Sequence, residues 1–447
     1  MAYSPITDND VKEMLNKIKL NSLDELFNIV PDKFKLDFDK FDIPKGLSEQ
    51  EVYAKLSEIG EKNSASKNDT FIGGGAYDHY VPTVVDFLSS RSEFYTAYTP
   101  YQPEVSQGTL QYLYEFQSMI CELSGMDISN ASLYDGASAV AEACSMSIAS
   151  NRKKKIVISS SVNPEYISVV KSYFSYNGIT VDFSESENGV TNSKNLLKSI
   201  DSETSCVVVQ SPNYYGLLED LEAICELKST YPDLLVICVS DPMSLSLIKS
   251  PGDCGCDVYV GEGQSLGNYL SFGGPYIGLF AAKEKYVRKM PGRIIGRTVD
   301  VDGKEGFVMT LQTREQHIRR ERATSNICTN QGLIALRCTI YLSLLGKHGL
   351  VNIAKRCFEN TQYAADQIST LDNFSLKYES KNFIKEFLVS TSFSVKNLIE
   401  DAGQNGFNIS ALKNDDSDSL FLLAFTEKYP KDKIDSFVKY LKNYKES

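Results

Sequence analysis

Short apolar runs alternate with helical patterns through the middle of the chain. The run from Leu234 to Val239 is too short and too rich in branched side chains for a helix, so it predicts a strand buried on both faces. Strands that alternate with helices are typical of β–α–β units. The pattern therefore predicts an α/β fold with a mainly parallel sheet over residues 71–330. The other strand-like runs are residues 156–158, 179–181, 206–209, 258–260 and 277–280.

The pattern changes before this region. Near the beginning of the chain, Thr7 or Asp8 precedes apolar residues at helical spacing, and a charged stretch follows at residues 61–67. A polar cap before an apolar periodicity marks the start of a helix. We therefore expect residues 1–70 to form a helical arm and a linker.

The pattern changes again after residue 330. Helical patterns at residues 333–345 and 350–371 precede short strand-like runs at 387–389 and 420–423, and an amphipathic helix begins at Lys431. These segments predict a smaller C-terminal α+β domain over residues 331–447.

The charge of the chain limits its partners. A formal net charge of −12 and a pI near 5.0 disfavour nucleic acid and anionic membranes, because both repel a net anion. Asp8, Asp10 and Glu13 interrupt the first apolar segment, which argues against a signal peptide or a membrane span. We expect a cytoplasmic protein without a nucleic-acid or membrane partner.

The cysteines and histidines predict no metal site. The chain has 10 cysteines and 3 histidines, and the closest cysteine pair, Cys254 and Cys256, lacks the second cluster of a zinc site. Buried, reduced thiols are the simpler interpretation.

Asp241 follows the apolar run that ends at Val239. In open α/β sheets, ligands bind outside the carboxyl ends of the strands, and a carboxylate there can keep a pyridine nitrogen protonated. The alternative is an aspartate that caps the next turn.

Small residues open a helix after Tyr134. The free amides of Gly136, Ala137 and Ser138, with the Ser138 hydroxyl, could hold a phosphate. The alternative is an ordinary helix cap, since small polar residues begin many helices.

Three tyrosines crowd a segment that cannot be a regular helix. Tyr95, Tyr98 and Tyr101 stand beside Pro100 and Pro103. Because tyrosine combines an apolar ring with a polar tip, this segment is typical of an interface or a substrate pocket, although a structural loop remains the alternative. The candidate residues in it are Tyr95, Tyr98, Thr99, Tyr101 and Gln102.

Two further features have a structural and a functional interpretation. His79 lies between Asp78 and Tyr80 without a nucleophile at a suitable spacing, so a structural histidine is favoured over an active-site one. The segment 314–322 is predicted to be a charged helix with a solvated face. Its dense arginines leave a subunit interface open as the alternative. The interface candidates are Arg314, Arg319 and Arg320.

Six segments, in order along the chain, resemble the P protein of the glycine cleavage system, the decarboxylating glycine dehydrogenase. That family occurs as one long chain of two homologous halves or as two separate subunits, and this chain is similar to subunit 1, which corresponds to the N-terminal half. The resemblance implies a fold type I, pyridoxal-phosphate-dependent transferase-like large domain. The segments are residues 76–80, 98–108, 251–253, 272–275, 289–293 and 323–328.

The resemblance also implies a missing nucleophile. Alignment through residues 251–253 and 272–275 puts Gln264 and Ser265 where the other half carries its Schiff-base lysine, and a serine hydroxyl cannot form a Schiff base. Asn163, where relatives often have histidine, would stand beside the cofactor ring. The resemblance thus implies a remnant cofactor pocket of Gly136, Ala137, Ser138, Asn163, Asp241, Gln264 and Ser265, with the cofactor bound covalently on a lysine-bearing subunit 2.

By resemblance, the complete enzyme decarboxylates glycine with pyridoxal 5'-phosphate and passes the aminomethyl group to the lipoyl arm of the H protein, in an α2β2 heterotetramer. Two alternatives stay open. The chain could be a self-sufficient enzyme that uses Lys249 or Lys283, or a non-enzymatic subunit that serves assembly alone.

Overall fold

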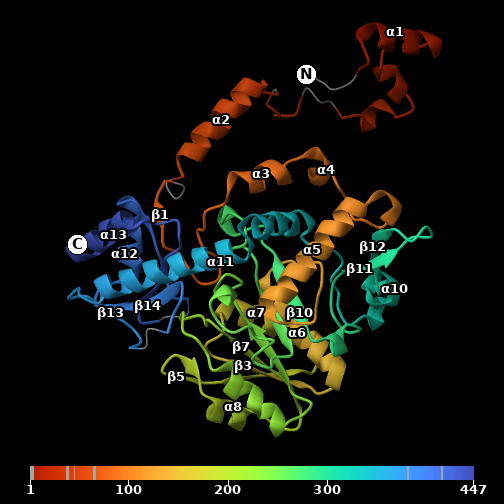
Figure 1. Ribbon diagram of the computed structural model, residues 1–447. Helices are drawn as coiled ribbons and strands as arrows, with labels where there is room; N and C mark the ends of the chain where they lie inside the picture. Colours follow the sequence, from red (N-terminus) through yellow and green to blue (C-terminus); the bar gives the residue numbers. More distant parts are fainter. Residues whose placement is uncertain are drawn as a thin grey trace. The chain divides into compact units, whose positions relative to one another are not determined.

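The computed structural model describes residues 5–36, 40–44, 46–63, 67–379, 382–413 and 416–446 (Figure 1). The chain divides into two compact units, Met1–Ser64 and Ala65–Ser447. The domain boundaries expected near residues 70 and 330 stay predictions.

The first unit contains the helices α1 (Asp8–Lys17) and α2 (Glu49–Glu61). Thr7 caps α1: its hydroxyl accepts a hydrogen bond from Asp10 N at 3.3 Å, and the Asp10 carboxylate accepts one from Thr7 N at 2.7 Å. This reciprocal cap satisfies amides that have no partner inside the helix. The helix predicted to begin at Thr7 or Asp8 is therefore confirmed.

Seven strands form the central sheet of the second unit, in the order β2-β10-β9-β8-β7-β3-β4. Strands β9, β8, β7, β3 and β4 are parallel, whereas β10 runs antiparallel to both β9 and β2. Each apolar run predicted as a strand within residues 71–330 overlaps a strand of this sheet, so the mainly parallel α/β fold is confirmed. The strands are β2 (Ile128–Ser129), β3 (Lys155–Ser159), β4 (Thr180–Ser184), β7 (Thr204–Gln210), β8 (Leu235–Val239), β9 (Val258–Glu262) and β10 (Gly278–Ala282).

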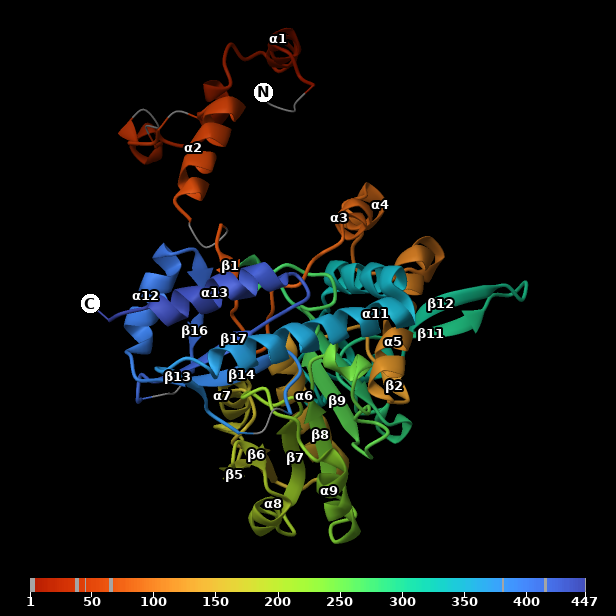
Figure 2. The ribbon, with the colours of Figure 1, turned by 60° about the vertical axis from the view of Figure 1, so that its left-hand side comes forward.

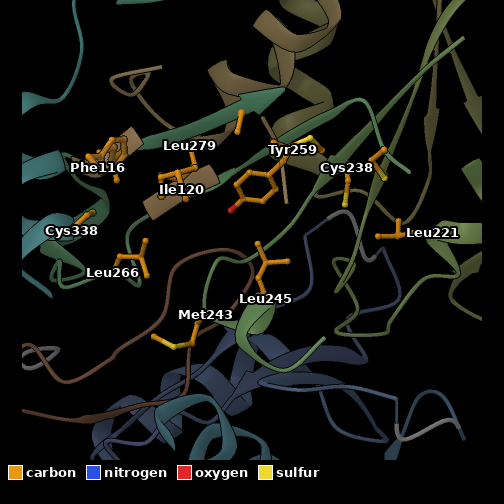
Figure 3. Close-up of a cluster of buried hydrophobic side chains, with 14 of the residues drawn as sticks. Phe116, Ile120, Leu221, Cys238, Met243, Leu245, Tyr259, Leu266, Leu279 and Cys338 are labelled. Carbon is orange, nitrogen blue, oxygen red and sulfur yellow. The ribbon is translucent and has the colours of Figure 1, made fainter. Parts of the chain in front are cut away.

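Side chains of β8 alternate between two apolar clusters. Cys238 belongs to the cluster on one face of the sheet that also contains Tyr259 of β9 and Phe116 and Ile120 of α5 (Gln107–Ser124) (Figure 3). Ile237 packs on the opposite face with α6 (Gly136–Asn151) and α7 (Pro164–Phe174). Burial on both faces explains why the strand sequences are continuously apolar. The remaining helices of this region are α8 (Ser193–Ser199) and α9 (Leu221–Cys225).

A second, antiparallel sheet lies in the C-terminal part, with the order β13-β14-β17-β16. The two helices predicted before it form α11 (Gly332–Ile368), which is broken at Gly346, where φ is +58°. Figures 1 and 2 show this sheet and the last helices together at one side of the molecule, as expected for a smaller α+β part. Its elements are β13 (Phe374–Leu376), β14 (Glu386–Thr391), α12 (Val395–Gln404), β15 (Phe407–Asn408), β16 (Ser410–Ala411), β17 (Leu420–Ala424) and α13 (Lys431–Asn443).

Several short elements complete the second unit. A hairpin of β11 (Ile294–Val299) and β12 (Glu305–Thr310) projects from the body (Figure 2). None of the helices in the described part of the chain combines the length and apolar character needed to cross a membrane. The other short elements are β1 (Asp69–Thr70), α3 (Thr83–Ser89), α4 (Ser92–Tyr95), β5 (Ser186–Glu187), β6 (Val190–Thr191) and α10 (Gln316–Arg319).

Candidate functional site

Asp241 lies just beyond the carboxyl end of β8, and its carboxylate is held by three other residues. Its Oδ2 accepts hydrogen bonds from the Ser244 backbone N at 3.0 Å and from Ser244 Oγ at 2.8 Å. Its Oδ1 accepts one from Ser265 Oγ at 3.2 Å. The ammonium of Lys385 lies 2.9 Å from Oδ2. Burial alone would raise the pKa of Asp241, but Lys385 holds that pKa below its usual range.

Lys385 immediately precedes β14 and extends a chain of polar contacts away from Asp241. Its Nζ lies 3.7 Å from the centre of the Tyr77 ring and 3.1 Å from His79 Nε2. Because an ammonium only donates, Nε2 is the acceptor, and Nδ1–H then donates to Glu427 Oε2 at 2.7 Å. Burial alone would raise the pKa of Glu427, but the hydrogen bonds that its carboxylate accepts from His79 and from Tyr80 N lower it. His79 thus belongs to a buried polar network.

Glu386, the next residue, also faces the space around Asp241. Its Oε1 accepts a hydrogen bond from the Tyr77 hydroxyl at 2.6 Å, and its Oε2 accepts one from Gly74 N at 2.8 Å. Burial raises the pKa of Glu386 to about 7. We call the space lined by Tyr77, Asp241, Lys385 and Glu386 the Asp241 pocket.

Two acidic side chains already bind the free amides at the start of α6. The Asp135 carboxylate accepts hydrogen bonds from Ser138 N at 2.8 Å and Ser138 Oγ at 2.7 Å, and Glu262 Oε2 accepts one from Gly136 N at 2.9 Å. Two of the three residues predicted as phosphate ligands therefore give their N–H groups to carboxylates, while Ala137 lies between them. Burial raises the pKa of Glu262 to about 8. A phosphate at this turn would lie beside two acidic side chains.

Asn163 and Gln264 fix the segment that crosses the pocket. Asn163 Nδ2 donates to Gly74 O at 2.8 Å. Gln264 Oε1 accepts from Tyr77 N at 2.8 Å, and its Nε2 donates to Tyr77 O at 3.0 Å. These amides hold the backbone of residues 74–77 and so position the Tyr77 ring against Lys385.

The sequence profile described as Glycine cleavage system P-protein matches residues 1–441. The chain belongs to this family. A probable glycine dehydrogenase (decarboxylating) subunit 1 from Desulforamulus reducens is 48% identical over 392 residues, which cover 88% of this chain and 87% of the relative. The resemblance noted from the six sequence segments is therefore confirmed.

Solved structures agree with the assignment to the P-protein family. The crystal structure of a glycine decarboxylase (P-protein) of the glycine cleavage system, in inhibitor-bound form, superimposes with a TM-score of 0.90 at 37% identity and covers 99% of each chain. A glutamate decarboxylase from Lactobacillus brevis has a TM-score of 0.69 at 12% identity, covering 93% of this chain and 99% of its own, which shows the fold alone. The fold is that of the pyridoxal-phosphate-dependent enzymes of fold type I.

The Asp241 pocket of this P-protein chain does not fit pyridoxal phosphate. Its cavity has a volume of about 20 Å³, which is room for roughly one water molecule. The Lys385 ammonium lies against the carboxylate that would face the pyridine nitrogen, and Ser265 supplies no amine. The pocket therefore lacks the space for the cofactor and a free carboxylate for its pyridine nitrogen. The acidic side chains at the start of α6 also disfavour its phosphate.

The two lysines considered from the sequence lie elsewhere. Lys249 is exposed and pairs with Glu222, while Lys283 Nζ donates to Gly125 O at 3.3 Å and Gly252 O at 3.5 Å. Neither contacts Asp241. Lys385 is the lysine that contacts Asp241, and it was not among the residues predicted from the sequence. Its signal in the sequence is a pair of adjacent charges, Lys385 and Glu386, inside the apolar run Phe383–Val389.

The tyrosine segment lies apart from the Asp241 pocket. α4 ends at Tyr95, and the following residues form an irregular loop, as the prolines predicted. Tyr95, Tyr98 and Tyr101 are 67%, 87% and 54% exposed, and Gln102 is exposed as well. Thr99 is half-buried, and its carbonyl accepts from Tyr101 N at 2.9 Å. We call residues 95–102 the tyrosine loop.

The prediction of a charged helix over residues 314–322 is wrong. Its helical part, α10, has only 4 residues, because Arg320 adopts φ +54° and ψ −128° and ends it. Arg314 is half-buried, donates to the carbonyls of Leu311, Met290 and Gly292, and has a pKa lowered by burial. It therefore stabilises the loop, whereas Arg319 and Arg320 are exposed.

Proposed function

We propose that this chain is the lysine-free subunit of a heteromeric glycine decarboxylase. In this proposal pyridoxal phosphate is bound covalently to a homologous, lysine-bearing subunit 2. The observation that carries the proposal is the closed Asp241 pocket, in which Lys385 faces Asp241 and a serine takes the lysine position. A P-protein chain whose own pocket cannot hold the cofactor needs a partner that does.

The tyrosine loop is the surface that suits this partnership. Tyr98 is 87% exposed, although a large aromatic side chain is normally at least partly covered. In the assembled enzyme this loop would cover the partner's active site, orient glycine and exclude water. The remaining aminomethyl group would pass to the lipoyl arm of the H protein. We propose an α2β2 heterotetramer in the cytoplasm.

The test is reconstitution. The purified chain is incubated with pyridoxal phosphate, treated with borohydride and analysed by peptide mass spectrometry, alone and with subunit 2. Glycine carboxyl exchange with bicarbonate is measured in the same samples. We expect no reduced adduct and no exchange with the chain alone, and both with the pair, with the adduct on the partner. An adduct on Lys249, Lys283 or Lys385 that accompanies exchange by the chain alone would instead support a self-sufficient enzyme.

A subunit that serves assembly alone is the second candidate, because the closed pocket leaves this chain without a nucleophile of its own. The two candidates differ in what the tyrosine loop does. A substitution in the loop that lowers turnover but leaves assembly intact supports the active-site role. Unchanged turnover supports assembly alone.

A further inference from the structure

A second cavity, of about 180 Å³, lies behind the tyrosine loop. The loop, the side of α5 and residues 329–333 enclose it, and Arg293 forms part of its wall. A water molecule occupies roughly 30 Å³ of liquid, so this volume corresponds to about six waters. That is the size of a ligand with a few non-hydrogen atoms. We call it the Arg293 cavity.

Arg293 is only 5% exposed and has no counter-ion among the described residues. Its Nη1 donates to Thr329 Oγ1 at 3.2 Å and to Asn330 Oδ1 at 2.8 Å, and its Nη2 donates to Cys328 O at 3.2 Å. The Nε atom is buried and has no hydrogen-bond acceptor. Burying a guanidinium costs free energy when its partners are neutral and its Nε–H has no acceptor. A bound anion would offset this cost by pairing with the charge.

The walls of the cavity supply no such anion. None of the described residues that line it is acidic. Burial raises the pKa of Tyr112 to about 12, so that hydroxyl remains a neutral donor, and it bonds to Gly332 O at 3.3 Å. The Tyr101 ring covers Arg293 with its centre 5.7 Å from Cζ, a neutral contact. The cavity thus carries one positive charge among aromatic and neutral polar groups.

The backbone holds Arg293 firmly in this position. Ala131 N donates to Arg293 O at 2.8 Å, and Asn130 Nδ2 donates to Pro291 O at 3.1 Å. Gly292 has φ +71°, and a side chain there would meet Asn130 Nδ2 at 3.0 Å. The guanidinium is therefore positioned before any ligand arrives, which lowers the entropy lost on binding.

We propose that the Arg293 cavity binds the carboxylate of a small molecule, about the size of a two-carbon amino acid, with Arg293 as the anion receptor. The planar guanidinium presents its donors in a fork that matches a carboxylate. Glycine, the substrate under the proposed function, belongs to this class. Binding by the isolated chain nevertheless needs neither the cofactor nor the partner, so the two proposals can fail separately.

The test uses sodium acetate, glycine and acetamide as probes, titrated calorimetrically into the isolated full chain at constant ionic strength. Acetamide has the shape of acetate without its charge. We expect saturable binding of acetate and glycine, and binding of acetamide at least tenfold weaker. Equal binding of acetate and acetamide, or no saturable binding of acetate, would overturn the proposal.

Because Arg293 is buried, replacing it could prevent folding. A substitution that places a carboxylate beside Arg293 tests the proposal without removing the guanidinium. Thr329 is exposed, and its hydroxyl already contacts Arg293, so Thr329→Asp places a carboxylate beside the guanidinium. Thr329→Asn is the neutral control of the same shape. We expect acetate to bind Thr329→Asp at least tenfold more weakly than it binds Thr329→Asn, because only the aspartate supplies a competing negative charge. Equal affinities in the two variants would show that Arg293 does not bind the carboxylate.

Discussion

The Lys385 ammonium lies 2.9 Å from the Asp241 carboxylate, and the two side chains are only 4% and 11% exposed. In a pyridoxal enzyme of this fold, a carboxylate at this position would accept a hydrogen bond from the protonated pyridine nitrogen. Here Lys385, next to the C-terminal sheet, supplies both the positive charge and the donor. The ion pair therefore stabilises the pocket in a closed form and takes the place beside Asp241 that a pyridine nitrogen would need.

Replacing Lys385 with methionine should destabilise the protein strongly. Lys385→Met leaves the Asp241 carboxylate buried without its cation, and breaking a buried pair in this way costs about 3–5 kcal/mol. The free energy of unfolding, measured with urea, is the readout. The double variant Lys385→Met, Asp241→Asn removes both charges and should recover at least half of the loss. A single variant as stable as the parent would mean that the pair contributes little.

Glu386 should make the stability depend on pH. Its pKa is raised to about 7 from an ordinary value of 4.5. The folded state therefore holds a proton that the unfolded chain has released, and the free energy of unfolding falls as the pH rises from about 4.5 to about 7, by up to about 1.4 kcal/mol per pH unit. Above pH 7 this contribution becomes constant.

The matched variant is Glu386→Gln, which cannot titrate but keeps an acceptor for the Tyr77 hydroxyl. Urea unfolding between pH 4.5 and 8 should give a flatter stability profile for this variant than for the parent. Glu262, with a pKa raised to about 8, titrates in both proteins and cancels in the comparison. Identical profiles would show that Glu386 is ionised throughout this range.

The tyrosine loop should matter for turnover but not for stability. Tyr98→Phe or Tyr101→Phe removes one hydroxyl, and the loss of one hydrogen bond to substrate or partner should lower the turnover of the reconstituted enzyme about three- to tenfold. The free energy of unfolding should change by about 0.5 kcal/mol or less, because both side chains are exposed. Tyr176→Phe, at a side chain that is 99% exposed after α7, is the control. Early melting with full turnover would assign the loop a structural role.

Arg319 and Arg320 test the proposed subunit interface. If they face subunit 2, the double charge reversal Arg319→Glu, Arg320→Glu should weaken the complex by several kcal/mol, because like charges in an interface are costly. Co-purification with subunit 2 and the dissociation constant are the readouts. Lys194→Glu, Lys198→Glu on the exposed side of α8 is a control with the same charge change. Equal recovery of the complex from both variants would assign Arg319 and Arg320 to solvent.

Local periodicity was enough to predict the elements of the large sheet. Each residue of β8 belongs to one of two clusters in strict alternation, and the apolar run in the sequence reports this double burial directly. The cap at Thr7 is equally local, since its partner Asp10 is only three residues away. The expectation that Ser265 stands where the family's other half carries a lysine depends on a single position between two matched segments, and it stays a prediction.

A local pattern failed where it had to predict a backbone bend. The charge spacing of residues 314–322 suits a helix, but Arg314 donates to carbonyls of the preceding loop and Arg320 adopts a positive φ. These contacts with neighbouring segments outweigh the weak helical preference of a short charged segment.

The closure of the pocket was decided only by the tertiary structure. Lys385 and Glu386 lie at the start of β14, Asp241 lies just beyond the end of β8 and His79 lies in the segment before α3, and no local period links them. Whether these groups meet depends on how the two sheets pack. The sequence by itself determined the strands and the helix cap, because each is encoded within a few neighbouring residues. The structure decided which charge faces Asp241, because the electrostatic contacts of a buried carboxylate are made by whichever residues the folded chain brings within a few ångströms.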